Sequence, residues 1–130
     1  MEWKTVKIEK TRRGSSSPYA SIGIGKIALS YGACALIVDY PKYKFAQLLV
    51  GNQNGKKVIG IRLLEEDAEN CLKINKRKLN GEIIAYSGSL DNKPLMEQLF
   101  GAQGVALRVK RYAISLDSDD RNVLVIHLED

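Results

Sequence analysis

The chain has 130 residues, of which 45% are hydrophobic and 27% charged, a composition typical of one globular domain over residues 1–130 and not of a disordered chain. No apolar run approaches the roughly 18 residues that a membrane-spanning helix needs, and the N-terminus contains no apolar signal core. The sequence therefore gives no reason to expect a membrane partner, and we expect a soluble cytoplasmic protein.

Positive charge is spread over most of the chain, whereas the C-terminal end is acidic. Residues 1–111 carry 19 Lys and Arg against 10 Asp and Glu, a net charge of +9, and residues 112–130 carry one Arg against five acids, a net charge of −4. A surface of this kind is suited to a polyanion. The charge distribution therefore favours nucleic acid as a partner, although basic proteins with other partners are common.

The N-terminal part is predicted to contain two strands separated by a loop. Residues 2–10 alternate polar and apolar side chains and include Trp, Val and Ile, which predicts a first strand at a sheet edge. Residues 11–19 are rich in Gly, Ser and Pro and are expected to form a mobile loop. Residues 21–30 then predict a second strand that bends at Gly25.

A short helix and a hairpin are expected next. Ser30 is suited to cap a helix over residues 31–38, because a serine hydroxyl accepts a hydrogen bond from the first helical turn. Two apolar segments, 45–50 and 57–64, flank the dipeptide Asn54-Gly55, which is the strongest short hairpin signal in the chain. This hairpin is the clearest local prediction.

The second half of the chain is predicted to repeat this order of elements. The prediction comprises a short strand over residues 71–75, a turn over 75–81, a strand over 82–86, a turn over 87–89, a helix from a cap at Asn92 or Asp91 to Gly101, and strands over 105–116 and 122–128 around a turn at 117–121.

The two halves lead to a prediction of the architecture. Residues 20–66 and 78–130 are interpreted as an internal repeat, in which Ile59–Glu66 corresponds to Val123–Asp130. The expected fold is α+β and mainly antiparallel, with two tandem β-α-β-β units packed as one compact pseudo-symmetric domain.

No constellation of residues indicates catalysis or metal binding. Cys34 and Cys71 lie singly in apolar segments, so we expect buried reduced thiols. His127, the only histidine, alternates with valines and is interpreted as a half-buried sheet residue. We therefore predict that the protein is not an enzyme, with no cofactor and no metal.

Eight basic residues are the candidate nucleic-acid contacts. One pair precedes three serines, one lysine follows a glycine, two lysines alternate with aromatic residues, and three residues form a continuous run. Each of these groups would also fit a solvated surface or a linker. These candidates are Arg12, Arg13, Lys26, Lys42, Lys44, Lys76, Arg77 and Lys78. Tyr40, Tyr43 and Phe45, which surround Lys42 and Lys44, are the candidate stacking platform for a single strand.

The segment Gly25-Lys26-Ile27-Ala28-Leu29, followed by a small helix and a β-hairpin, resembles the strand, helix and hairpin of the AbrB/MazE/MraZ swapped-hairpin superfamily of DNA-binding proteins. One branch of that superfamily carries two such units in tandem. The resemblance implies double-stranded DNA binding, a role in transcriptional regulation, a homodimer, and a DNA-contacting role for Lys26. Residues 20–130 also resemble a group of uncharacterised bacterial proteins, a likeness that implies no function.

The functional prediction is a nonenzymatic nucleic-acid-binding protein with double-stranded DNA as the ligand and a homodimeric assembly. Two alternatives stay open. The first is a protein-interaction or structural subunit of phage or mobile-element origin, which would present an apolar surface to its partner. The second is a single-stranded nucleic-acid binder of PC4-like type, which would present aromatic and basic side chains together on a sheet.

Overall fold

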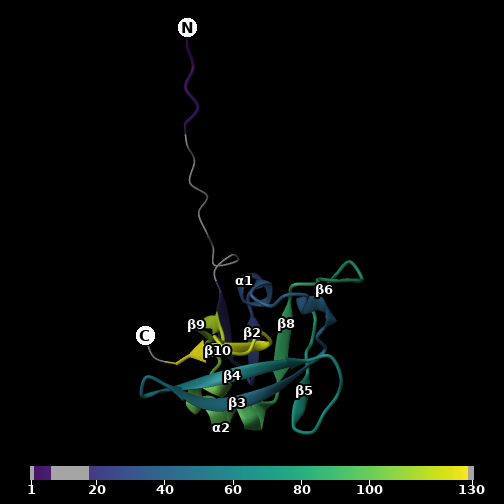
Figure 1. The fold of residues 1–130 in the computed structure, drawn as a ribbon, viewed down its shortest axis with the longest axis vertical. Coiled ribbons are helices and arrows are strands. Elements are labelled where there is room, and N and C mark those ends of the chain that lie inside the picture. The colour runs from purple at the N-terminus through teal and green to yellow at the C-terminus, as the bar shows by residue number, and fades with distance from the viewer. Residues whose placement is uncertain (1, 7–17, 129–130) are drawn as a thin grey trace.

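The computed structural model describes residues 2–6 and 18–128 (Figure 1). The described helices are α1 (Tyr31–Ala35), the 3-10 helix η1 (Tyr40–Lys42), α2 (Lys93–Phe100) and α3 (Ala102–Val105). The strands are β1 (Tyr19–Gly23), β2 (Lys26–Leu29), β3 (Phe45–Gln53), β4 (Lys56–Leu64), β5 (Cys71–Lys73), β6 (Lys78–Leu79), β7 (Glu82–Ile83), β8 (Gly88–Asp91), β9 (Lys110–Leu116) and β10 (Val123–His127).

Eight of these strands form one antiparallel sheet in the order β5-β3-β4-β10-β9-β1-β2-β8. The two edges of this sheet approach one another, because Asn75, just after β5, forms an antiparallel bridge to Ser89 of β8. The sheet is therefore nearly closed, and its edge strands are largely protected from pairing with other chains. β6 and β7 pair with each other as a separate small hairpin. The predicted α+β class with mainly antiparallel strands is confirmed.

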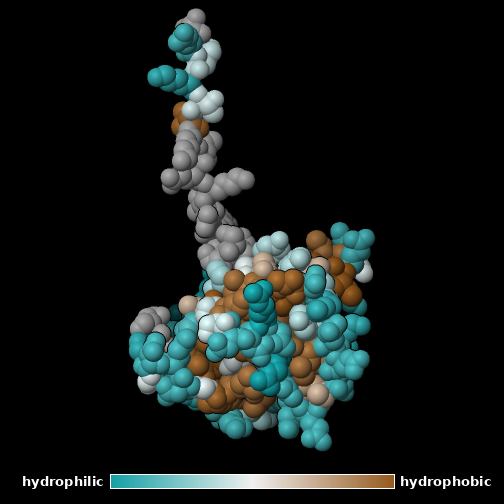
Figure 2. Space-filling model, in the orientation of Figure 1, coloured by the Kyte–Doolittle hydropathy of each residue, from teal (hydrophilic) through white to brown (hydrophobic). Residues whose placement is uncertain are grey.

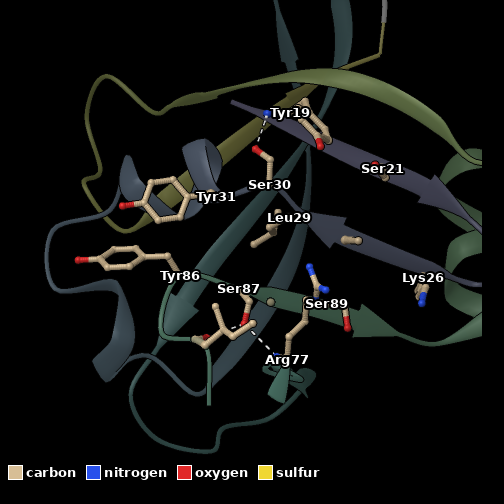
Figure 3. Close-up of a pocket in the computed structure, with 13 residues that line it drawn as sticks. Tyr19, Ser21, Lys26, Leu29, Ser30, Tyr31, Arg77, Tyr86, Ser87 and Ser89 are labelled. Carbon is tan, nitrogen blue, oxygen red and sulfur yellow. Dashed lines mark hydrogen bonds between the residues drawn. The ribbon is translucent and has the colours of Figure 1, made fainter. Parts of the chain in front are cut away.

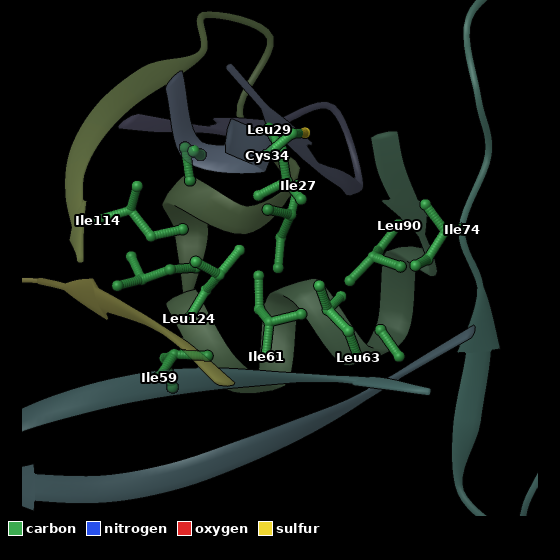
Figure 4. Packing of buried hydrophobic residues seen from close by; sticks show 14 of the residues in the cluster. Ile27, Leu29, Cys34, Ile59, Ile61, Leu63, Ile74, Leu90, Ile114 and Leu124 are labelled. Carbon is green, nitrogen blue, oxygen red and sulfur yellow. The ribbon is translucent and has the colours of Figure 1, made fainter. Parts of the chain in front are cut away.

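The inward faces of the sheet enclose the hydrophobic core (Figure 4). Alternate strand positions supply it, as at Ile59, Ile61 and Leu63 of β4, and α2 adds Met96 and Leu99. Each large aliphatic side chain buried in this way contributes about 1.5–3 kcal/mol relative to exposure. The core therefore fixes which side of each strand points outward, where the candidate site lies.

Three local predictions are confirmed by hydrogen bonds and dihedral angles. Ser30 caps α1, with its hydroxyl accepting from the Ala33 amide at 3.1 Å, and Asn92 caps α2, with its side chain accepting from the Leu95 amide at 3.1 Å. The turn between β3 and β4 has positive φ at Asn54 (54°) and Gly55 (79°), as a two-residue hairpin requires.

Several boundaries differ from the sequence prediction. Residues 2–6 form no strand, and the rest of the predicted strand over 2–10 lies outside the described residues. The predicted turn at 87–89 is wrong, because β8 begins at Gly88. The predicted strand over 105–116 begins later, because Val105 is the last residue of α3 and β9 begins at Lys110. α1 ends at Ala35, three residues before the predicted end at Val38.

The predicted bend at Gly25 is a complete reversal of the chain. Ile24 and Gly25 have φ of 47° and 78°, and they form the turn between the antiparallel strands β1 and β2. A β-branched residue rarely adopts positive φ. Two backbone hydrogen bonds from other parts of the chain stabilise it here: the Ile24 amide donates to the Ala106 carbonyl at 2.8 Å and the Gly25 amide to the Gly104 carbonyl at 2.9 Å.

The inward positions of β4 and β10 differ by one residue from the predicted correspondence of Ile59 with Val123. Ile59 and Ile61 belong to the core cluster, as do Leu124 and Ile126, and Val123 is buried outside that cluster at 7% exposure. Aligning Ile59 with Val123 would therefore bring together side chains on opposite faces of the sheet, because strand side chains alternate between the two faces.

Candidate functional site

A hollow of about 510 Å³ lies against the outer surface of β1, β2 and β8 (Figure 3). We call it the first hollow. It is lined by Tyr19, Ser21, Lys26, Ala28, Leu29, Ser30, Tyr31, Arg77, Ile84, Tyr86, Ser87, Gly88 and Ser89. These described residues include aromatic, hydroxyl and basic side chains and no Asp or Glu, so the hollow is suited to an anion with an aromatic portion.

The floor of the first hollow is made of small side chains. Ser21 of β1 pairs with Ala28 of β2, and Ala28 pairs with Ser89 of β8, so the three form one row across the sheet. They occupy the outward positions, since their neighbours Ile22, Ile27 and Leu90 are in the core. A flat floor without bulky side chains leaves room for a planar group to approach the sheet.

Two tyrosines form an aromatic wall. The rings of Tyr31 and Tyr86 have centroids 5.3 Å apart and planes inclined by 54°, and the two side chains are 55% and 36% exposed. Tyr86 also stacks on Tyr40, with centroids 6.3 Å apart and planes at 22°. The buried Tyr40 ring therefore supports the Tyr86 ring from the core side, and Tyr31 is the more exposed of the two wall residues.

Cationic side chains line the first hollow or lie beside it. Lys26 and Arg77 line the first hollow, and Figure 3 shows the guanidinium end of Arg77 beside Ser89. Arg111 of β9 pairs with Ser21 and lies with its guanidinium carbon 4.4 Å from the centre of the Tyr19 ring. This contact orients the guanidinium while leaving Arg111 exposed. Arg77 and Arg111 therefore lie at the two ends of the row formed by Ser21, Ala28 and Ser89.

Beneath the aromatic wall lies a buried polar cluster. The Tyr40 hydroxyl donates to the Ser87 carbonyl at 2.7 Å, and the Lys76 Nζ lies 3.7 Å from the centre of the Tyr40 ring. Lys76 Nζ is buried with no hydrogen-bond partner, and burial lowers the pKa of its ammonium group although the nearby Cys34 opposes this shift. Burial also raises the pKa of the Cys34 thiol and of the Tyr40 phenol.

The predicted contact residues fall into separate regions. Lys26 and Arg77 come together at the first hollow, whereas the Lys76 amine is buried and does not join them. Lys78 is exposed on β6. Arg12 and Arg13 lie outside the described residues.

The aromatic side chains predicted to form a stacking platform are buried or half-buried, and Phe45 is among the half-buried ones. Tyr40 is 0% exposed, and Tyr43 is half-buried with the Lys42 amine 5.2 Å from its ring centre. Lys42 and Lys44 are exposed, but neither lines the first hollow. The prediction that Tyr40 is available for stacking is therefore wrong, because the residue instead fills the core below Tyr86.

Sequence reasoning missed four aromatic or basic residues of the site, Tyr19, Tyr31, Tyr86 and Arg111, as well as the serines of its floor. Tyr19 had a detectable signal, since it continues the outward alternation of Ser21 against the buried Ala20 and Ile22. Tyr86 had none, because the turn that precedes β8 places it. Arg111 became adjacent to Ser21 only through the pairing of β1 with β9.

His127 is half-buried on β10, as predicted, and its Nε2 lies 2.7 Å from the Ser115 Oγ. Among residues 2–6 and 18–128, no group of three or more His, Cys, Asp or Glu side chains is arranged to hold a metal ion. In the same part of the chain, no helix has the length and apolar character needed to cross a membrane.

No protein-family model, curated protein or solved structure matches the chain.

Proposed function

We propose that the protein is a nonenzymatic binder of single-stranded nucleic acid, and that the first hollow is its primary contact. The observation that carries this proposal is the joint placement of Tyr31 and Tyr86 with Lys26, Arg77 and Arg111 around a floor of small residues. Aromatic rings beside cations on a curved sheet are the usual means by which proteins bind single strands without strong sequence preference.

The two kinds of side chain have separate tasks in this proposal. A base stacks on the exposed Tyr31 ring, which is supported by Tyr86, and such stacking is worth about 1–3 kcal/mol per base. The phosphates on either side are bound by Arg77 and Arg111, whose planar guanidinium groups donate two parallel hydrogen bonds to phosphate oxygens. The hydroxyls of Ser21 and Ser89 on the floor are suited to donate to the sugar or base.

Single-stranded ligands fit this surface better than double-stranded DNA. A duplex hides the faces of its bases, so the aromatic wall would have nothing to stack on. Readout of the major groove normally uses an α-helix or a two-stranded ribbon that enters the groove. The described helices have at most eight residues, and the longest, α2, buries Met96 and Leu99 in the core. Duplex binding and transcriptional regulation therefore remain predictions from the sequence resemblance.

A protein partner is the second candidate function, and one observation favours it. The β6–β7 hairpin exposes Leu79 (64%) and Ile83 (62%), and Figure 2 shows hydrophobic atoms at the corner of the molecule where Figure 1 places β6. Exposed apolar side chains on a protruding hairpin are suited to contact another protein. This surface is separate from the floor of the first hollow, so the two candidate functions can be tested independently.

We also infer that the nearly closed sheet is built from two related halves, β1-β2-α1-β3-β4 and β5-β8-α2-β9-β10. In this comparison β1, β2, β3 and β4 correspond to β5, β8, β9 and β10, and exchanging them leaves the order of neighbouring strands unchanged. The corresponding strands β2 and β8 pair with each other, as do β4 and β10. β1 lies between β2 and β9, and its counterpart β5 lies between β8 and β3. On this view β6 and β7 are an insertion, and the repeat begins at β5. The predicted homodimer is independent of this repeat. The molar mass of the purified protein, measured by light scattering, tests it.

Fluorescence anisotropy tests the proposed function. Labelled single-stranded DNA, RNA and duplex DNA of one length are titrated with the protein at two salt concentrations. We expect the single strands to bind more tightly than the duplex and to weaken as salt increases. Equal or tighter binding of the duplex would favour the sequence-based prediction of a double-stranded DNA binder. An absence of binding to all three would favour the protein-interaction function.

A further inference from the structure

A second hollow, of about 490 Å³, lies beside the first. Its polar lining includes Asn54, Lys56 and Lys57 from the β3–β4 hairpin and His127 from β10, and Ala113 of β9 also contributes. No Asp or Glu is among its described lining residues. The second hollow is therefore also suited to an anion, but no Tyr, Phe or Trp lines it.

The two hollows meet at one pair of residues. Tyr19 lines the first hollow and Ala113 lines the second, and these two residues pair directly across β1 and β9. Ala113 is exposed and small, so it places no bulky side chain at the boundary. His127 lies on β10, the other neighbour of β9, and pairs with Val58 of β4. The outer surface thus continues from β8 to β4 past both hollows.

We propose that one nucleic-acid strand occupies both hollows, with a stacked base and its flanking phosphates at the first and further phosphates of the same strand in the second. This inference rests on the proposed function and states which part of the strand each hollow binds. The first hollow supplies Tyr31 and Tyr86 for stacking. The second supplies nitrogen donors and no Tyr, Phe or Trp, since Lys56 and Asn54 are suited to bind phosphate and sugar oxygens.

His127 has a defined orientation in the second hollow. Its Nε2 lies 2.7 Å from the Ser115 Oγ, and this contact orients the imidazole ring on the outer side of β10. Lys56 lies on the same side of β4 as Val58, which pairs with His127. Lys57 lies on the opposite side with Ile59, and its Nζ donates to the Leu99 carbonyl at 3.4 Å. Lys56 is therefore the main cation that we assign to the backbone contact.

The dimensions of the sheet set the length of the bound strand. From β8 to β4 there are five strand intervals, in the order β8-β2-β1-β9-β10-β4. At about 4.8 Å per interval the path is roughly 24 Å. A stacked strand rises about 3.4 Å per nucleotide, so this path holds at most about seven nucleotides. A site of this size lies within the range of about 4–16 nucleotides that small barrels bind.

The test compares oligothymidylates of two to twelve nucleotides by anisotropy competition. We expect the affinity of the unmodified protein to increase with length up to about seven nucleotides and then to level off. In the double variant Lys56→Gln/His127→Gln, trinucleotides should bind as tightly as before, while octanucleotides should bind about tenfold more weakly. Lys73→Gln, which removes one exposed charge from β5 and lines neither hollow, is the matched control and should leave both lengths unaffected.

A second variant tests the boundary between the hollows and does not depend on removing charge. Ala113→Phe places a ring on the exposed surface where the hollows meet, and it should weaken long oligonucleotides without affecting trinucleotides. The inference is overturned if affinity levels off at three nucleotides, or if both variants bind octanucleotides like the control. If no oligonucleotide binds at any length, the proposed function itself is wrong, and the two failures are thereby distinguished.

Discussion

Tyr86 lies between two other tyrosines, with Tyr31 at 5.3 Å on the solvent side and the buried Tyr40 at 6.3 Å on the core side. The three rings thus connect the surface of the first hollow to the hydrophobic core. Aromatic contacts of this kind contribute about 0.5–1.5 kcal/mol each beyond burial. A ligand that stacks on Tyr31 therefore meets a surface that is already ordered and loses little conformational entropy on the protein side.

The first prediction concerns the aromatic wall. Replacing Tyr31 or Tyr86 by Leu should weaken single-strand binding by roughly 5- to 150-fold, because each ring contributes about 1–3 kcal/mol of stacking. The dependence of affinity on salt should stay unchanged, since no charge is removed. Anisotropy titrations at several salt concentrations measure both quantities. Tyr31→Phe keeps the ring and should bind like the unmodified protein; equal losses for Phe and Leu would argue against stacking.

The second prediction concerns the cations. Substituting Gln for Arg77, Arg111 or Lys26 should weaken binding and should reduce the slope of log affinity against log salt by about 0.7 for each phosphate that the variant no longer binds. The Lys73→Gln variant removes the same charge from an exposed position outside the first hollow and should keep the slope. A slope that falls equally in all four variants would indicate a general charge effect and not a specific path for the strand.

The comparison of Lys76 with Arg77 shows what the sequence could predict and what it could not. Caps and tight turns depend on neighbouring residues, so Ser30, Asn92 and Asn54-Gly55 were predicted correctly. Lys76 and Arg77 look equivalent in a basic run, yet the bridge between Asn75 and Ser89 fixes the chain there. The Lys76 amine is buried beneath Tyr40, whereas Arg77 lines the hollow. That difference depends on a contact between distant segments.

The same reason explains why most of the candidate site was not predicted. Lys26 and Arg77 were identified as cations, but nothing local shows that β2 and the segment before β6 lie beside one another. The tyrosine pair joins the first residue of α1 to the turn before β8. Strand pairing between distant segments decides such neighbours, and it is specified by the whole core and not by a short pattern.

The third prediction concerns the buried Lys76 amine and the pH dependence of stability. Lys76→Met keeps a chain of similar length over the Tyr40 ring and removes an amine that has no hydrogen-bond partner. We expect the free energy of unfolding at pH 7 to increase by about 1 kcal/mol, because the cost of burying the amine outweighs its attraction to the ring.

The sign of the pH effect follows from the lowered pKa of Lys76. The unfolded chain holds this proton up to the ordinary value of 10.5, and the folded protein releases it at a lower pH. The free-energy cost of burying the charged ammonium group is therefore fully present below the folded-state pKa of Lys76 and disappears above 10.5. The gain in unfolding free energy from Lys76→Met should accordingly shrink as the pH rises from the folded-state pKa to 10.5. Urea unfolding of both proteins at pH 7 and pH 10 measures it. A constant difference would show that the pKa is not lowered.

The fourth prediction concerns the close contact between Gly88 and Tyr40. A Cβ at Gly88 would collide with the Tyr40 hydroxyl and would lie 3.0 Å from the Ile74 Cγ2. Gly88→Ala should therefore displace the ring that supports Tyr86 and lower the free energy of unfolding by about 1–3 kcal/mol. Gly51→Ala is the matched control on β3, since its Cβ would meet only the Val58 Cγ2 at 3.6 Å.

A double-mutant cycle separates this collision from a general effect of the extra methyl group. Tyr40→Phe removes the hydroxyl that donates to the Ser87 carbonyl and should cost about 1 kcal/mol alone. In the Tyr40→Phe background the added methyl group meets less resistance, so Gly88→Ala should cost less than it does in the unmodified protein. Chemical unfolding of the four proteins gives the coupling. Additive losses would show that the hydroxyl is not what requires glycine at this position.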